Sequence, residues 1–174
     1  MQERQVTIGE NTYPLGEPFL VMATQNPIEQ EGTYPLPEAQ VDRFMFKLLV
    51  KYPDKASERL VLRQNTTPSD LSILKDVVSP EEILEAQNII QDIDVDEKIE
   101  DHVLKLIFAT RDPQDHGLND LEGIIDFGAS PRATINLVRA AKSRAFTERR
   151  GYITPEDIRY CLLYTSPSPR DVIQ

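Results

Sequence analysis

Residue types that often carry chemistry are scarce in this 174-residue chain. It has no tryptophan, one cysteine, Cys161, and two histidines, His102 and His116. A single cysteine excludes an internal disulfide. Because both histidines lie far from Cys161 in the sequence, we expect no metal site built from these three residues.

Long apolar runs and a basic charge excess are also missing. No run approaches the roughly 18 consecutive apolar residues that a membrane span needs. Met1 is followed by Gln-Glu-Arg-Gln, which is not a signal peptide. The net charge is -10, which argues against a general nucleic-acid binder. We therefore expect a cytoplasmic protein with no membrane span and no nucleic-acid partner.

One acidic stretch resembles the start of a calcium-binding loop. Asp92, Asp94 and Asp96 alternate as the first ligands of such a loop would. The sixth position, however, is Glu97 where glycine is needed, and the twelfth is Val103 where glutamate is needed. We interpret the stretch as an acidic helix junction and predict no metal-binding residues.

The first part of the chain has the pattern of a small α/β unit. Residues 5–8 and 12–15 are β-prone runs around a Gly/Asn turn, which predicts a β-hairpin. Residues 19–24 and 44–50 are short, almost continuous apolar runs. Such runs are typical of strands that are buried on both faces of a parallel sheet.

The rest of the chain is predicted to be helical. Helical spacing covers residues 54–64, and a second helix is expected over 96–110. Three more helices begin at Ser79-Pro80, Ser130-Pro131 and Thr154-Pro155, the first with a capping box. The apolar positions that we expect these helices to bury are Ile83, Leu84, Ala86, Ile89, Ile90, Ile99, Val103, Leu104, Ile107, Phe108, Ile135, Leu137, Val138, Ala141 and Ala145.

Charge is distributed unevenly along these helices. Residues 70–126 hold sixteen acids and four bases, whereas residues 130–150 hold six bases and one acid. Pairing between the helices, together with solvation, is the simpler interpretation. The alternative is that one or two of these arginines reach an anionic ligand or a neighbouring subunit.

The last residues, 161–174, differ in character from the rest. Their Ser-Pro-Ser-Pro segment cannot continue the helix that begins at Thr154. The segment resembles translated adapter read-through, so we expect a non-native tail and leave it out of the functional argument.

Asn26 is the first candidate site residue. Pro27 restricts Asn26 to extended backbone, so its amide is expected to project from the carboxyl end of a parallel strand. Ligands bind at that edge in open α/β sheets, and an amide can orient a water or a phosphate oxygen. A turn-forming asparagine that caps its own backbone is an equally good interpretation.

Arg43 is the second candidate. Residues 37–42 predict a short helix, and Arg43 follows at its carboxyl end, where the helix dipole favours a cation. A structural arginine paired with Asp42 or Glu38 is one interpretation. The other is an arginine finger, which stabilises charge on a transferring phosphoryl group.

Arg132 is the third candidate. Of the three Ser/Thr-Pro helix starts, two continue with acids, which the positive end of a helix favours, and only this one continues with an arginine. A cation at this place costs about a few tenths of a kcal/mol. A broken local rule favours a functional role, and a helix N-terminus with an arginine is a good phosphate site.

A close resemblance to the MoxR family of AAA+ ATPases lies in MQERQVTIGENTYPLGEPFLVMATQNPIEQEGTYPLPEAQVDRF. The later runs FGASPRATINLVRAAKSRAF and GYITPEDI resemble the lid domain of that family, so the likeness covers roughly residues 1–159. It implies an α/β fragment, a partial parallel-sheet AAA+ core with a β-hairpin, followed by an all-α helical lid domain. Residues 1–65 would form the C-terminal portion of the core: the hairpin, the sensor 1 strand, the arginine-finger helix and the last strand. Residues 66–160 would form the lid.

The resemblance also implies a role for each candidate. Asn26 matches the sensor 1 asparagine that positions the hydrolytic water. Arg43 matches the arginine finger offered to ATP on the adjacent subunit, and Arg132 matches the sensor 2 arginine of the lid. By family, ATP and Mg²⁺ would be bound, with Asn26 and Arg132 at the nucleotide. The full-length protein would form a ring, often a hexamer, with a partner that carries a von Willebrand factor A domain, and would act as a chaperone-like remodeller or in cofactor or metal insertion.

The sequence departs from the family in one respect. It contains no Gly-x-x-x-x-Gly-Lys-[Ser/Thr] and no apolar strand that ends in an Asp-Glu pair. We therefore expect a fragment that begins at an internal methionine and is inactive alone. Two alternatives stay open: a related ring ATPase of the magnesium chelatase type, and a non-catalytic acidic helical interaction module.

Overall fold

The computed structural model describes residues 4–24, 37–48, 50–66, 76–121, 123–125 and 127–165. Its elements follow in the order β1 (Gln5–Ile8), β2 (Asn11–Pro14), α1 (Glu38–Val41), α2 (Lys55–Thr66), α3 (Pro80–Gln91), α4 (Glu97–Arg111), η1 (Gln114–His116), η2 (Asn119–Leu121), α5 (Pro131–Thr147) and α6 (Pro155–Thr165). No helix in these ranges is long and apolar enough to cross a membrane.

The predicted hairpin is present. Strands β1 and β2 pair antiparallel, with Val6 opposite Tyr13 and Ile8 opposite Asn11. Gly9 forms the turn at φ +63°, a left-handed conformation that glycine adopts without strain. The hydroxyls of Thr7 and Thr12 lie 2.9 Å apart across the ladder.

The two apolar runs differ from the prediction of a parallel sheet. Residues 19–24 carry no strand, and neither do the described residues of the second run, 44–48 and 50. Their side chains are largely exposed, with Leu20 at 83% and Val50 at 95%. A strand forms only when a second strand satisfies its backbone groups, and no described strand pairs with either run.

The helices begin where the local signals placed them. Ser79 caps α3 with the complete capping box, in which Glu82 returns a bond to the Ser79 amide. Asp54 accepts from the Ser57 amide at the start of α2. Asp96 caps α4, so the stretch that resembled a calcium loop is an acidic helix junction, as interpreted.

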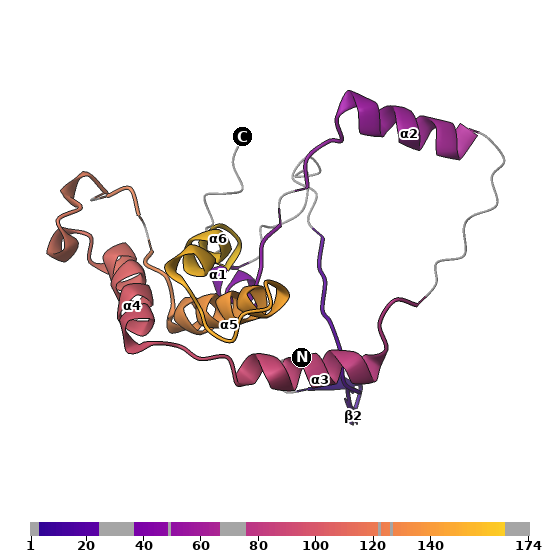
Figure 1. The fold of residues 1–174 in the computed structure, drawn as a ribbon, viewed down its shortest axis with the longest axis horizontal. Coiled ribbons are helices and arrows are strands. Elements are labelled where there is room, and N and C mark those ends of the chain that lie inside the picture. Colours follow the sequence, from indigo (N-terminus) through magenta and orange to yellow (C-terminus); the bar gives the residue numbers. More distant parts are fainter. Residues whose placement is uncertain are drawn as a thin grey trace.

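The core lies between α4, α5 and α6, which Figure 1 shows gathered on one side while α2 stands apart. Helix α5 packs against α3, α4 and α6. Its buried face is built from small residues, which allow close approach, and from Leu137. The buried apolar residues are Ile93, Ile99, Val103, Ile107, Ala133, Leu137, Ala140, Ala141, Ala145, Ile153, Ile158 and Cys161.

Several positions expected in the core are exposed instead. On α4 these are Leu104 and Phe108, on α5 Ile135, and on α3 Ile83 and Ile89. Helix α3 has no fully buried residue among those described, because only α5 covers it to an appreciable extent. Cys161, the first residue of the expected tail, is 6% exposed and lies within α6.

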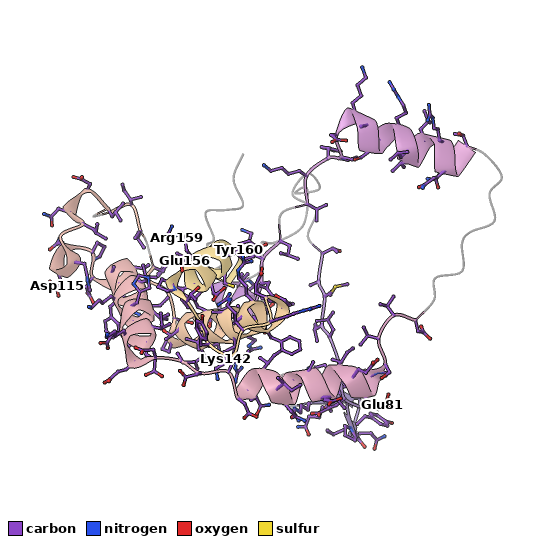
Figure 2. The ribbon with its side chains drawn as sticks, viewed as in Figure 1. Glu81, Asp115, Lys142, Glu156, Arg159 and Tyr160 are labelled. Atoms are coloured by element: carbon purple, nitrogen blue, oxygen red, sulfur yellow. The ribbon has the colours of Figure 1, made fainter. Side chains whose placement is uncertain are left out.

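A buried ion pair fixes the turn between α5 and α6. Asp157 is 1% exposed and accepts two bonds from Arg150, of 2.8 and 2.7 Å. The amide and hydroxyl of Thr154 also donate to it, at 2.9 and 3.0 Å. Arg144 lies 3.3 Å from the same carboxylate and 3.5 Å from the ring centre of Tyr160, which Figure 2 labels on α6.

Candidate functional site

Arg132 stands in the first turn of α5. Ser130 is the N-cap residue, with extended backbone, and its side-chain oxygen accepts from the Arg132 amide at 3.2 Å. The first turn contains no acidic residue. The sequence therefore places a cation at the positive end of a seventeen-residue helix, and that placement needs a compensating anion.

Asp42, which lies 90 positions earlier in the chain, supplies that anion. Its Oδ1 accepts from the Ser130 hydroxyl at 2.6 Å, and its Oδ2 accepts from Nη1 of Arg132 at 2.8 Å. Partial burial alone would raise the pKa of Asp42. The bonds from Ser130 and Arg132, with the charge of Arg132, outweigh burial and hold that pKa below its ordinary value.

The turn before α5 is held by the end of α4. The amide of Ala129 donates to the hydroxyl of Thr110 at 2.9 Å, and Nε of Arg111 donates to the Ala129 carbonyl at 2.8 Å. Gly128 lies so close to Arg111 that a Cβ added to the glycine would be 2.5 Å from Cγ of Arg111. These contacts set the position of the α5 N-terminus, and sequence reasoning missed them.

Arg43 directly follows the anchored Asp42. It is exposed, whereas Val41, Asp42, Phe44 and Met45 are half-buried. Met45 packs against the helical core. One interpretation of the sequence paired Arg43 with Asp42, but the carboxylate of Asp42 bonds Ser130 and Arg132 instead.

The structure thus links two of the three predicted site residues indirectly, through Asp42. Arg132 binds Asp42, and Arg43 is the next residue along the chain. Asn26 lies outside the described residues. Within the described ranges, no group of three His, Cys, Asp or Glu side chains could hold a metal ion.

The basic stretch 130–150 pairs in part between helices, as the simpler interpretation expected, because Arg144 of α5 lies 3.3 Å from the carboxylate of Asp157 on α6. The ion pairs of this stretch in the described structure join Arg132 to Asp42, Arg144 to Glu148 and Asp157, and Arg150 to Asp157. None of these acids lies in the acidic stretch 70–126. Lys142 contacts that stretch through a backbone oxygen, since its Nζ donates to the Gln91 carbonyl at 2.7 Å.

The arrangement around Arg132 is chemically a receptor for one oxyanion. At the N-terminus of α5, a hydroxyl and a guanidinium bind a single carboxylate, and phosphate oxygens accept hydrogen bonds from the same donors. The Arg132 side chain is 47% exposed, so a ligand can reach it from solvent.

Known families match two separate regions of the chain. Residues 1–46 match the family described as "ATPase family associated with various cellular activities (AAA)". Residues 121–165 match the AAA lid domain. The first match contains Asp42 and Arg43, and the second contains Ser130 and Arg132, so the ion pair joins the two matched regions.

Individual relatives agree with these matches. The chain is 46% identical over 159 residues to Chaperone MoxR1 of Mycobacterium tuberculosis, covering 91% of this chain and 41% of the relative. It is 32% identical over 169 residues to Protein MoxR of Methylorubrum extorquens, covering 91% of this chain and 49% of the relative. The chain spans about half the length of the curated relatives it matches.

A solved structure confirms the fold class. The crystal structure of a putative ATPase from Cytophaga hutchinsonii superposes with a TM-score of 0.89 at 49% identity, over 95% of this chain and 50% of that one. The predicted α/β fragment with a hairpin and a helical lid is therefore the observed type of fold. Taken with the sequence matches in both regions, this shows that the chain belongs to the MoxR family of AAA+ ATPases.

Proposed function

We propose that this chain is part of a MoxR-type ATPase in which Arg43 and Arg132 contact the phosphates of ATP. The observation that carries the proposal is the site at the N-terminus of α5, where Ser130 and Arg132 together bind a carboxylate. The oxygens of a phosphate accept hydrogen bonds from the same two donors.

Arg43 is proposed as an arginine finger for the ATP of an adjacent subunit. It is exposed at the end of α1, between half-buried neighbours on both sides, so its guanidinium can reach a second molecule. An arginine supplied from outside stabilises the charge that develops on the transferring phosphoryl group. Asn26 is proposed to orient the attacking water at the chain's own nucleotide.

We assign no Mg²⁺ ligand to the described residues, which offer no suitable group of side chains. When bound, Mg²⁺ neutralises charge on the β- and γ-phosphates. For this chain we propose the phosphate contacts of Arg43 and Arg132 and the positioning of water by Asn26. We propose that the isolated chain does not hydrolyse ATP.

The work driven by hydrolysis is proposed from the relatives. One of them is named a chaperone, which supports chaperone-like remodelling, with cofactor or metal insertion in partner proteins as the related possibility. We propose a ring of identical subunits, often a hexamer, in the cytoplasm, with a partner that contains a von Willebrand factor A domain.

A graft tests the catalytic assignment. Residues 1–159 would replace the matching segment of the Mycobacterium tuberculosis relative, and ATP turnover would be measured. We expect turnover close to that of the parent. Arg43→Ala or Arg132→Ala should each lower kcat by about 100-fold or more, because each removes charge stabilisation at the transferring phosphoryl group.

Arg139→Ala is the matched control, because Arg139 is an exposed arginine of the same helix α5. It should leave turnover unchanged. If all three variants lost kcat equally, the loss would come from the change in net charge, and the roles assigned to Arg43 and Arg132 would be contradicted. Turnover by the isolated 174-residue chain that disappears on Arg132→Ala would contradict the proposed dependence on the rest of the ATPase.

A further inference from the structure

We propose that Asp42 is a positioning residue that occupies Arg132 until a phosphate displaces it, and that this exchange releases the segment that carries Arg43. The inference rests on the proposed function, because it assumes that Arg132 binds phosphate. It gives Asp42, which the sequence offered only as a partner of Arg43, a role that couples the two arginines.

Asp42 already occupies the donors of the proposed phosphate site. Asp42 uses both of its carboxylate oxygens on the site, one on the Ser130 hydroxyl at 2.6 Å and one on Arg132 at 2.8 Å. These are the side-chain donors that a phosphate at the start of α5 would need. Carboxylate and phosphate therefore compete for the same donors, and only one of them can hold the full set.

The ion pair between Asp42 and Arg132 is open to exchange with another anion. The side chains of Arg132 and Asp42 are 47% and 30% exposed, so water already screens their attraction. A terminal phosphate carries about two negative charges at neutral pH, against one on Asp42. The phosphate group is thus the stronger partner for the same donors.

The contact made by Asp42 also holds the segment that carries Arg43. The segment 41–45 lies on the helical core through two anchors, the Asp42 carboxylate and the side chain of Met45. Arg43 is the exposed residue between these anchors. When phosphate takes the donors of Asp42, one anchor is lost, and Arg43 gains freedom to move toward a phosphate of its own.

The coupling acts in both directions. If phosphate at Arg132 frees Arg43, then pulling Arg43 onto a phosphate must weaken the hold of Asp42 on Arg132 by the same factor. The two arginines are therefore expected to engage phosphate together. When no phosphate is present, Asp42 occupies Arg132 and restricts the movement of the segment that carries Arg43.

The test uses the full 174-residue chain with tripolyphosphate as the probe. Dissociation constants would come from NMR shifts of the backbone amides of Ser130, Arg132 and Ala133, in the wild type, Asp42→Asn and Arg132→Gln. The control is Asp54→Asn, which removes the same charge at the N-terminus of α2, and Figure 1 shows that helix apart from α5. Asparagine remains a good cap there.

We expect Asp42→Asn to bind the probe about two- to fivefold more tightly than the wild type, because a screened ion pair opposes binding by that factor. Asp54→Asn should match the wild type, and Arg132→Gln should bind most weakly. Equal affinities of the wild type and Asp42→Asn, both tighter than Arg132→Gln, would overturn the inference and leave the proposed function standing. No loss on Arg132→Gln would overturn both.

Hydrogen exchange in the wild type gives a second readout that needs no variant. The Phe44 amide donates to the Val41 carbonyl at 3.0 Å within the anchored segment. Saturating tripolyphosphate should speed its exchange several-fold, and amides of the α6 core should not change. An unchanged Phe44 amide would overturn the link to Arg43, even if Asp42→Asn failed to fold.

Discussion

Asp157 is the side chain on which the α5–α6 junction depends most. Burial alone would raise its pKa, but the bonds from Arg150 and Thr154 lower the pKa from 3.8 to about 2. The same contact raises the pKa of Arg150. The carboxylate is therefore ionised in the folded chain over the whole ordinary pH range.

Acid should destabilise the chain through this residue. The folded pKa lies below the unfolded value, so the stabilisation is complete above about pH 4 and is lost as pH falls toward 2. Its size is about 2 kcal/mol. Chemical denaturation at pH 4 and pH 2 should show this loss in the wild type, whereas Asp157→Asn should be less stable at pH 4 and less sensitive to acid.

Asp76→Asn is the control for that measurement, because Asp76 is an exposed acid outside the junction. It should keep the acid response of the wild type. An Asp157→Asn variant with the same acid response as the wild type would show that the junction does not depend on the charge of Asp157.

At the residue scale, the sequence revealed that Arg132 is unusual at a helix start, but it did not reveal that Asp42 is the partner of Arg132. Arg132 was recognisable because it breaks the rule that favours acids at a helix start. Its counter-ion Asp42 lies 90 positions away and precedes a more obvious partner, Arg43. Long-range ion pairs have no local signature, so only the structure could reveal this one.

At the element scale, the sequence predicts those elements that depend on contacts between residues close together in the chain. Ser79, Asp96 and Ser130 each signal a helix start through contacts within three residues, and each prediction is confirmed. The hairpin is likewise a local turn between two short runs. The runs 19–24 and 44–50 have strand-like composition, but a sheet needs neighbours that composition cannot specify.

The turn that ends α5 contains a residue with an unfavourable backbone conformation. Arg149 has φ +56° in the turn that terminates the helix, a left-handed conformation that glycine adopts at lower cost. We predict that Arg149→Gly stabilises the chain by about 1 kcal/mol, measured as a rise in the thermal midpoint.

Arg149→Ala removes the same charge and side chain but keeps the strain, so it should not stabilise. A rise of equal size in both variants would mean that the side chain, rather than the backbone conformation, limits the stability of this turn.

At the scale of the whole molecule, the contact between Asp42 and Arg132 joins the two regions that match separate parts of an AAA+ ATPase. The exposed apolar side chains of 19–24 and α2, with Phe46, Leu48 and Val50, lie outside the helical core. In our account the chain serves two nucleotide sites, with Asn26 at one and Arg43 at the other.

Mixing two inactive variants of the grafted protein tests that account most directly. Asn26→Ala and Arg43→Ala chains would be purified separately, combined in equal amounts and assayed for ATP turnover. If Arg43 acts on the neighbouring subunit, a ring that contains both variants has sites with an intact asparagine and an intact finger. The account predicts that the mixture regains activity that neither variant has alone, and a mixture as inactive as its components would contradict it.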